Sequence, residues 1–279
     1  MITNRIDLYE YFGLERASSS GYLDVLVPPV LTEIKPKLRP AMLVIAGGAY
    51  VFVAPREGEA VALQYAANGY ATFALDYSIN VPYPTALLEA CMAVIYIREN
   101  ADKYNVDVNH VAAIGFSAGG HLAASLADLY GEKEIQSVLK DKTKLARIDA
   151  VVLSYPVITM GAYTDKQTRN IITGGDEKLA ERLSLENRVT ADSPPAFIWH
   201  TYEDNGVPVE NALLYASACR QAGVPFALHV FEHGGHGLSL CSDETNNQTD
   251  ADKELAKVGK WFGLSLDWLK SRGFQVKTI

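Results

Sequence analysis

Three separate stretches of the sequence carry the residue types that nucleophilic catalysis needs. Ser117 lies in the first stretch, Glu203 and Asp204 in the second, and His233 and His236 in the third. A serine hydroxyl is a poor nucleophile at neutral pH, so an imidazole must accept its proton and a carboxylate must orient and stabilise that imidazole. The three stretches together indicate acyl transfer through a covalent acyl-enzyme, with the choice within each acid and histidine pair left open.

Ser117 is the centre of a Gly-x-Ser-x-Gly motif between a strand-like run, residues 111–114, and a helix-like run, residues 121–129. A strand, a sharp turn and a helix would hold the serine at strained backbone angles. Gly115 and Gly119 are then needed where a Cβ would collide with the neighbouring strand or helix. The motif alone also fits a flexible Gly/Ser loop, so it is the flanking elements that favour a nucleophile turn.

Acyl transfer also requires donors for the negative charge that develops on the substrate's carbonyl oxygen. Backbone N–H groups suit this role when they already point at the oxygen. The sequence offers Ala118, directly after the serine, and the turn Gly47-Gly48-Ala49 after an early apolar strand. This chemistry requires no cofactor and no metal.

The elements that must position these groups alternate between strands and helices. Strands are predicted at 22–27, 41–45, 71–75, 111–114, 150–155, 196–200 and 226–231, and helices at 56–68, from Pro84 onward, at 121–129, at 209–222 and at 253–270. Residues 22–27 are expected in an edge strand or hairpin. The alternation predicts a parallel sheet with helices on both faces, in which active groups collect at the carboxyl ends of the strands. Residues 1–279 are expected to form one domain, with a small insertion at about 157–193 over that edge.

Composition narrows the classes of partner. The chain has 279 residues, 48% of them hydrophobic, with a net charge of −8 and no Lys/Arg cluster, which argues against nucleic acid or an anionic membrane. Polar residues stand where a signal peptide would be apolar, and the three cysteines suit reduced structural thiols, so a cytoplasmic protein is expected. The partner expected is a small-molecule ester; a homodimer is compatible with the sequence, which does not fix the oligomeric state.

Four segments give the chain a family resemblance: residues 115–121, 193–201, 204–211 and 233–237. The chain resembles the α/β-hydrolase esterase/lipase group, which includes hormone-sensitive-lipase-like esterases and acetyl-xylan and feruloyl esterase-like proteins, from about residue 41 to residue 269. The serine, acid, histidine order is that of this fold. The resemblance implies an α/β-hydrolase fold with a mostly parallel sheet of about eight strands and a small cap.

Carried over residue by residue, the resemblance makes Ser117 the nucleophile, Asp204 the acid and His236 the base. Gly48, Ala49 and Ala118 become the oxyanion donors. The family's oxyanion loop has His or Pro followed by three glycines, whereas this chain has Ala46-Gly47-Gly48-Ala49. The methyl group of Ala49 therefore predicts a preference for small acyl groups.

Several residues compete with these assignments. Glu203 and His233 are the rivals of Asp204 and His236; His110 and His229 suit structural roles, His121 suits support under the serine turn, and His200 a place beside the acid. Gly47, Tyr50 and Tyr155 are candidates for substrate contact, although aromatic residues at strand ends also serve in packing. The polar loop 239–252 fits either a solvated loop or a rim that binds hydroxyl groups.

The sequence thus favours a serine carboxylesterase for short-chain, acetyl-type esters, with small carbohydrates as the alcohol portion that the resemblance implies. Two alternatives remain at this stage. One is an amidase or peptidase of the prolyl-oligopeptidase type, which shares the order of the triad, and the other is a catalytically silent binding protein with the hydrolase fold.

Overall fold

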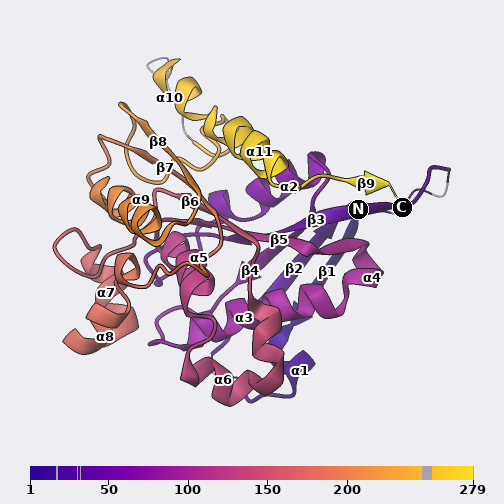
Figure 1. Ribbon diagram of the computed structural model, residues 1–279, viewed down its shortest axis with the longest axis horizontal. Coiled ribbons are helices and arrows are strands. Elements are labelled where there is room, and N and C mark those ends of the chain that lie inside the picture. Colours follow the sequence, from indigo (N-terminus) through magenta and orange to yellow (C-terminus); the bar gives the residue numbers. More distant parts are fainter. Residues whose placement is uncertain (17, 30, 32, 247–252, 279) are drawn as a thin grey trace.

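A central sheet with helices on both faces organises the computed structural model of the chain (Figure 1). The structure describes residues 1–16, 18–29, 31, 33–246 and 253–278. Within these ranges, no helix combines the length and the apolar character that crossing a bilayer requires. The three cysteine side chains are buried.

The sheet follows the strand order β1-β2-β4-β3-β5-β6-β7-β8, with β9 beside β3. The strands are β1 (Ile2–Asp7), β2 (Tyr22–Val27), β3 (Lys37–Ile45), β4 (Ala71–Asp76), β5 (Val106–Phe116), β6 (Ala150–Ser154), β7 (Ala196–Thr201), β8 (Phe226–Phe231) and β9 (Lys277–Thr278). The pairs from β4 to β8 are parallel, whereas β1, β2 and β9 pair antiparallel. The mostly parallel α/β sheet predicted from the sequence is confirmed.

Helices connect the strands and cover the sheet. They are α1 (Leu8–Phe12), α2 (Glu59–Ala67), α3 (Thr85–Glu99), α4 (Ala101–Tyr104), α5 (Ser117–Leu129), α6 (Lys133–Leu139), α7 (Lys166–Thr173), α8 (Glu177–Arg182), α9 (Glu210–Ala222), α10 (Lys253–Val258) and α11 (Trp261–Ser271). Short 3₁₀ turns are η1 (Pro55–Glu57), η2 (Lys140–Ala146) and η3 (Leu185–Asn187).

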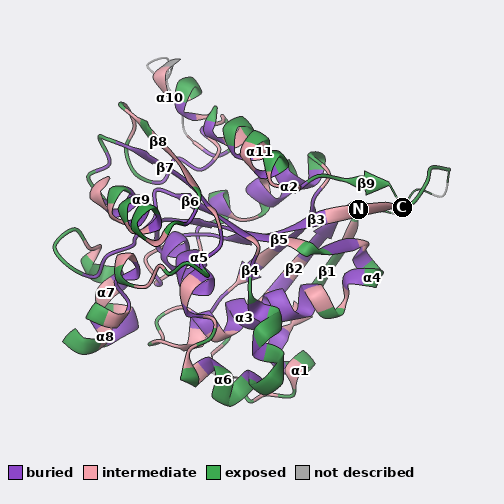
Figure 2. Cartoon of the chain, viewed as in Figure 1, coloured by how far each residue is buried: buried purple, intermediate pink, exposed green. Residues whose placement is uncertain are grey.

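Alternate residues of the central strands enter two different hydrophobic cores. Leu43 of β3 packs into the core formed with α3, α5 and α9, whereas its neighbour Val44 packs into the core formed with α2 and α11. This alternation follows from the period of two in a strand, and it explains why these strands are apolar on both faces. The central strands are accordingly buried along most of their length (Figure 2).

Two predicted helices differ from the structure. The helix expected at 56–68 begins with η1 and continues as α2, and the helix expected at 253–270 is divided into α10 and α11 near Gly259. Between β6 and β7, residues 157–193 carry α7, α8 and η3. One residue of this segment, Asp165, lines the same cavity as Ser117.

Candidate active site

The turn that carries Ser117 joins β5 directly to α5. Ser117 has φ of 52°, a left-handed conformation that side chains rarely adopt. A Cβ on Gly115 would collide with the carbonyl oxygen of Gly119, and a Cβ on Gly119 would collide with the carbonyl oxygen of Ala46. Both glycines are therefore required by close backbone approach, as expected for a strand-turn-helix nucleophile elbow.

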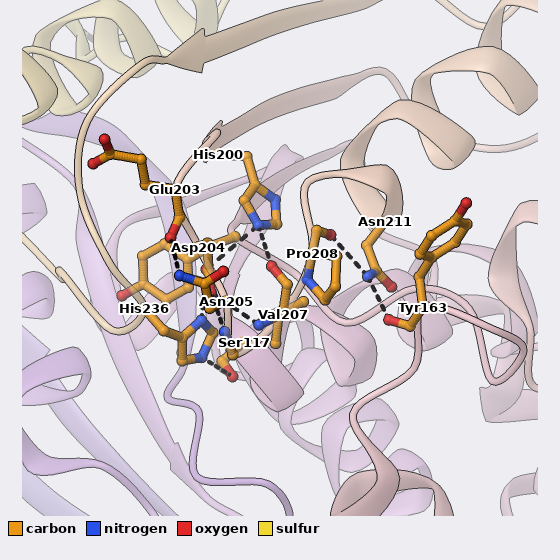
Figure 3. A network of polar contacts seen from close by, with 12 residues as sticks. Ser117, Tyr163, His200, Glu203, Asp204, Asn205, Val207, Pro208, Asn211 and His236 are labelled. Atoms are coloured by element: carbon orange, nitrogen blue, oxygen red, sulfur yellow. Dashed lines mark hydrogen bonds and ion pairs between the residues drawn. The ribbon is translucent and has the colours of Figure 1, made fainter.

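Ser117, His236 and Asp204 form one hydrogen-bonded chain (Figure 3). The Oγ of Ser117 lies 2.7 Å from Nε2 of His236, and Nδ1 of His236 lies 2.7 Å from Oδ2 of Asp204. Because an ionised carboxylate only accepts hydrogen bonds, it fixes the proton of the neutral imidazole on Nδ1. Nε2 is then free to accept the proton of the serine hydroxyl. The structure thus brings together the three residues assigned from the sequence to nucleophile, base and acid.

Asp204 is buried at the end of β7 and is held ionised by several donors. Its Oδ1 accepts the N–H groups of Gly206 and Val207, each at 2.9 Å, and Nε2 of His200 lies 3.4 Å from Oδ2. Burial alone would raise the pKa of Asp204, but the contacts with His200, His236 and the Val207 N–H outweigh it and hold that pKa well below its usual range. The acid therefore stays charged and can stabilise an imidazolium.

Glu203 and His233, the rivals of the assigned acid and base, pair with each other instead. His233 Nδ1 lies 3.0 Å from Oε1 of Glu203, whose other oxygen accepts the Gly234 N–H at 3.1 Å. Both side chains are exposed. This surface pair makes no hydrogen bond to Ser117 in the described part of the chain.

The remaining histidines also have partners outside the triad. His121 is buried, with Nδ1 accepting the Tyr50 hydroxyl at 3.1 Å and Nε2 donating to the carbonyl of Leu183 at 3.0 Å. Burial lowers the pKa of His121 to about 4, so its ring is neutral. His110 pairs with Asp107 at 3.0 Å. His229 lies in β8. These positions agree with the supporting roles expected for them.

The predicted oxyanion donors lie around the serine. Gly48 and Ala49 line the same cavity as Ser117, and Ala118 lies in the first turn of α5, where backbone N–H groups have no acceptor within the helix. Ala49 has φ of 53°, so this loop holds a non-glycine residue in the left-handed region. The assignment of these three donors stays a prediction.

The structure gives the three candidates for substrate contact other partners. The N–H of Gly47 donates to Oε2 of Glu57 at 2.8 Å and is not available to a ligand. Tyr50 is 3% exposed and bonds His121, and Tyr155 is 1% exposed and donates its hydroxyl to Glu57. Their burial and their partners favour a supporting role behind the site for Gly47, Tyr50 and Tyr155, and direct contact with substrate stays a prediction.

The cavity at Ser117 is small, at about 210 Å³. Besides Ser117, His236 and the oxyanion loop, its lining includes Phe52, Arg56 and Asp165. A larger depression of about 680 Å³ lies over β1, β2 and β4 and includes none of the triad residues. Ser117 and His236 thus line the smaller of these two cavities.

In the polar loop 239–252, the structure describes residues 239–246. Ser239 is buried, its Oγ donates to the carbonyl of Arg56 at 2.5 Å, and the Asn246 amide donates to the carbonyl of Leu238 at 2.6 Å. Residues 247–252 lie outside the described residues. The described part serves as internal bonding rather than as a hydroxyl-binding rim.

Two buried residues that support the site were not singled out from the sequence. Asn211, at the start of α9, donates to the carbonyls of Tyr163 and Pro208 (Figure 3). Its side-chain oxygen accepts the N–H groups of Ile158 and Thr159. Glu57 is 2% exposed and bonds the oxyanion loop. Asn211 at least lies in the 204–211 segment of the resemblance, whereas no sequence signal distinguished Glu57 from its surface neighbours.

Comparisons with known proteins place the chain among esterases. The BD-FAE family model matches residues 23–218. Endo-1,4-beta-xylanase B of Butyrivibrio fibrisolvens is 41% identical over 215 residues, which are 74% of this chain and 33% of that protein. The acetyl ester-xyloside bifunctional hydrolase of Caldicellulosiruptor lactoaceticus has a TM-score of 0.78 at 35% identity, covering 91% of this chain and 89% of that chain.

A third similar protein covers almost the whole chain. The carboxylesterase Cest-2923 of Lactobacillus plantarum WCFS1 has a TM-score of 0.82 at 28% identity, with 99% of both chains covered. The coverage of longer curated relatives is lower. The chain spans 33% of the length of the Butyrivibrio fibrisolvens xylanase and 54% and 41% of the lengths of two further esterases. The likeness therefore concerns only part of each of those longer proteins.

Proposed function

The chain belongs to the BD-FAE family, and from this premise we propose that it is a serine carboxylesterase that hydrolyses short-chain, acetyl-type esters of small carbohydrates. The observation that carries the proposal is the continuous chain Ser117–His236–Asp204, with both hydrogen bonds at 2.7 Å. A catalytically silent protein would have no need of a serine held at a strained angle against a correctly oriented imidazole.

The proposed reaction has two halves. Ser117 Oγ attacks the ester carbonyl carbon while its proton passes to Nε2 of His236, and the resulting imidazolium is stabilised by Asp204. The imidazolium then protonates the departing alcohol oxygen, which leaves the acyl group on Ser117. In the second half His236 removes a proton from water, the hydroxide oxygen attacks the acyl carbon, and the carboxylic acid departs as the serine recovers its proton.

The proposed substrate class rests on the cavity and on the relatives. Two of the similar proteins described above carry xylan- or xyloside-related names. The cavity of about 210 Å³ suits a small acyl group, and Arg56 and Asp165 among its lining residues offer a hydrogen-bond donor and an acceptor to hydroxyl groups. An acetylated sugar would present both features.

Ser117→Ala tests the mechanism. The variant is expected to lose hydrolysis of p-nitrophenyl acetate and labelling by a fluorophosphonate probe while keeping the wild-type melting temperature. Ser125→Ala, a buried serine farther along the same helix, is the matched control and should keep both activities. Undiminished turnover by Ser117→Ala would contradict the serine mechanism.

A second experiment tests the substrate class. The kcat/KM of the wild-type protein is measured for p-nitrophenyl acetate, for acetylated xylosides and for acyl amides of matched size. We expect the acetylated xylosides to be preferred over the amides, and Arg56→Leu to lower kcat/KM for the xylosides more than for p-nitrophenyl acetate. Preferred cleavage of the amides would instead favour an amidase.

A further inference from the structure

Glu57 places a buried carboxylate directly behind the oxyanion loop. It ends the turn η1 and is 2% exposed, whereas Glu59, two residues later, is exposed. Its Oε2 accepts the N–H of Gly47 at 2.8 Å, and its Oε1 accepts the hydroxyl of Tyr155 at 2.7 Å. A carboxylate is costly to bury unless its oxygens are hydrogen-bonded, so these two contacts are what allow it to stay there.

The Tyr155 hydroxyl extends this contact to the loop that carries the base. It accepts the N–H of Ser239 at 2.8 Å, and its ring packs edge-on against the imidazole of His236 with centroids 5.2 Å apart. Ser239 follows His236 by three residues, and its carbonyl accepts the indole N–H of Trp261 at 2.9 Å. Tyr155 therefore fixes both the backbone after the histidine and one side of its ring.

The second carboxylate oxygen of Glu57, Oε2, binds the peptide of Gly47, which lies beside Ser117. A Cβ built on Gly47 would lie 2.8 Å from Oε2 of Glu57 and 2.9 Å from Cβ of Ser117, so this peptide is enclosed between the two side chains. Gly48 and Ala49 follow immediately and line the cavity. Any rotation of the Gly47 peptide would move these two donors with it.

We propose that Glu57 is a positioning residue that holds the oxyanion loop and the histidine loop in register across Ser117. Its carboxylate joins Gly47 on one side to Tyr155, Ser239 and His236 on the other. The inference rests on the proposed esterase function. Because a misplacement of about 1 Å can cost about a hundredfold in rate, loosening this link should lower kcat while leaving ground-state binding nearly unchanged.

Glu57→Gln is the principal test, because it keeps the size of the side chain and one acceptor. If its oxygen accepts the Gly47 N–H, its amide must donate to Tyr155, whose own hydroxyl proton then has no acceptor. We expect kcat per titrated active site on p-nitrophenyl acetate to fall about tenfold to a hundredfold, with KM changed less than about threefold. Glu59→Gln is the matched control and should stay within twofold of the wild type.

Tyr155→Phe supplies the second variant, since it removes the hydroxyl but keeps the ring beside His236. It should lower kcat in the same manner, and the double variant should lose less than the product of the two single losses, because both break one connection. A merely structural role would lower the melting temperature without changing kcat per active site.

Two outcomes would overturn the inference. One is a kcat per titrated site within twofold of the wild type in Glu57→Gln, and the other is full additivity in the double variant. Absence of esterase activity in the wild-type protein would instead reject the proposed function, and this inference with it, so the two failures are distinguished before any variant is compared.

Discussion

Adjacent residues of identical chemistry have opposite roles at this site because of their surroundings. Asp204 is buried among donors and faces His236, whereas Glu203 is exposed and faces His233. Each carboxylate is paired with one histidine of the loop after β8. The spacing of the family motifs favoured Asp204 and His236 over this rival pair, and in the structure it is the pair with the buried carboxylate that contacts Ser117.

His236→Ala is expected to lower kcat on p-nitrophenyl acetate by at least about a thousandfold, because the serine loses its only general base. His233→Ala, which removes an imidazole from the same loop, is the control and should stay within about threefold. Steady-state kinetics of both variants makes the comparison. A large loss confined to His233→Ala would transfer the role of base to His233.

Ala49→Gly is expected to relax the preference for small acyl groups. For the wild-type protein we expect acetyl and propionyl p-nitrophenyl esters to have the highest kcat/KM, with octanoyl esters at least about tenfold worse. Glycine removes the methyl and also adopts the left-handed φ of 53° without steric cost.

Ala54→Gly is the control for this series, because Ala54 lines the same cavity with an ordinary φ of −73°. An optimum at octanoyl or longer in the wild type would contradict the small-acyl prediction. An unchanged profile in Ala49→Gly would show that its methyl does not set the limit.

Among the contacts between elements, Asn211 connects α9 to the segment after β6 and to the end of the loop that carries Asp204. Asn211→Ala removes an amide that forms four hydrogen bonds of 2.9–3.1 Å and leaves buried backbone groups without partners. We expect a loss of about 3 kcal/mol in the free energy of unfolding. For a chain of this size that corresponds to a melting temperature about 5 °C lower.

Thermal unfolding measures this prediction, with Asn187→Ala as the control because Asn187 is an exposed asparagine. An unchanged melting temperature in Asn211→Ala would mean that water replaces the lost contacts and that the segment does not depend on this side chain.

Strands and helices could be predicted from the sequence where a short stretch of residues carries a recognisable pattern. Apolar runs such as residues 41–45 and 71–75 identified buried strands, and the Gly-x-Ser-x-Gly spacing of Gly115 and Gly119 between a strand-like and a helix-like run marked the elbow. Contacts between distant segments were not predictable. The break between α10 and α11, and the contact of Glu57 with Tyr155, depend on tertiary packing that has no local pattern.

The same distinction applies to the site. The triad could be assigned because its order and motifs are local features of three loops. For the tyrosines, substrate contact and packing both stayed open, because position at a strand end does not tell whether a ring faces the cavity or the core. Tyr50 and Tyr155 face inward, where their hydroxyl groups satisfy buried partners.

Asp128 joins three distant parts of the fold. It lies near the end of α5, its Oδ1 accepts the hydroxyl of Ser193 before β7 at 2.5 Å, and its Oδ2 accepts the hydroxyl of Tyr215 on α9 at 2.8 Å. Burial raises the pKa of Asp128 to about 6, because desolvation outweighs these hydrogen bonds. The molecule therefore carries a structural carboxyl group that titrates close to neutral pH.

The raised pKa of Asp128 has a defined consequence for stability. The folded state binds this proton more tightly than the unfolded state, whose Asp pKa is about 3.9, so the contribution is fully present below about pH 4 and is lost as pH rises through about 6. Asp128→Asn removes the titration. The melting temperature of the variant relative to the wild type should therefore rise between pH 4.5 and pH 7.

Comparing Asp128→Asn with the wild type isolates the pH dependence of stability that Asp128 contributes. Burial lowers the pKa of His121 to about 4, so this residue has the opposite effect: it lowers stability as pH falls below about 6.5. The effect of His121 is the same in both proteins, so it cancels when their melting temperatures are subtracted. Asparagine also loses one of the hydrogen bonds that Asp128 accepts. This loss shifts the difference in melting temperature between the two proteins by an amount that does not vary with pH. A difference in melting temperature that stays constant from pH 4.5 to 7 would show that Asp128 ionises normally in the folded protein.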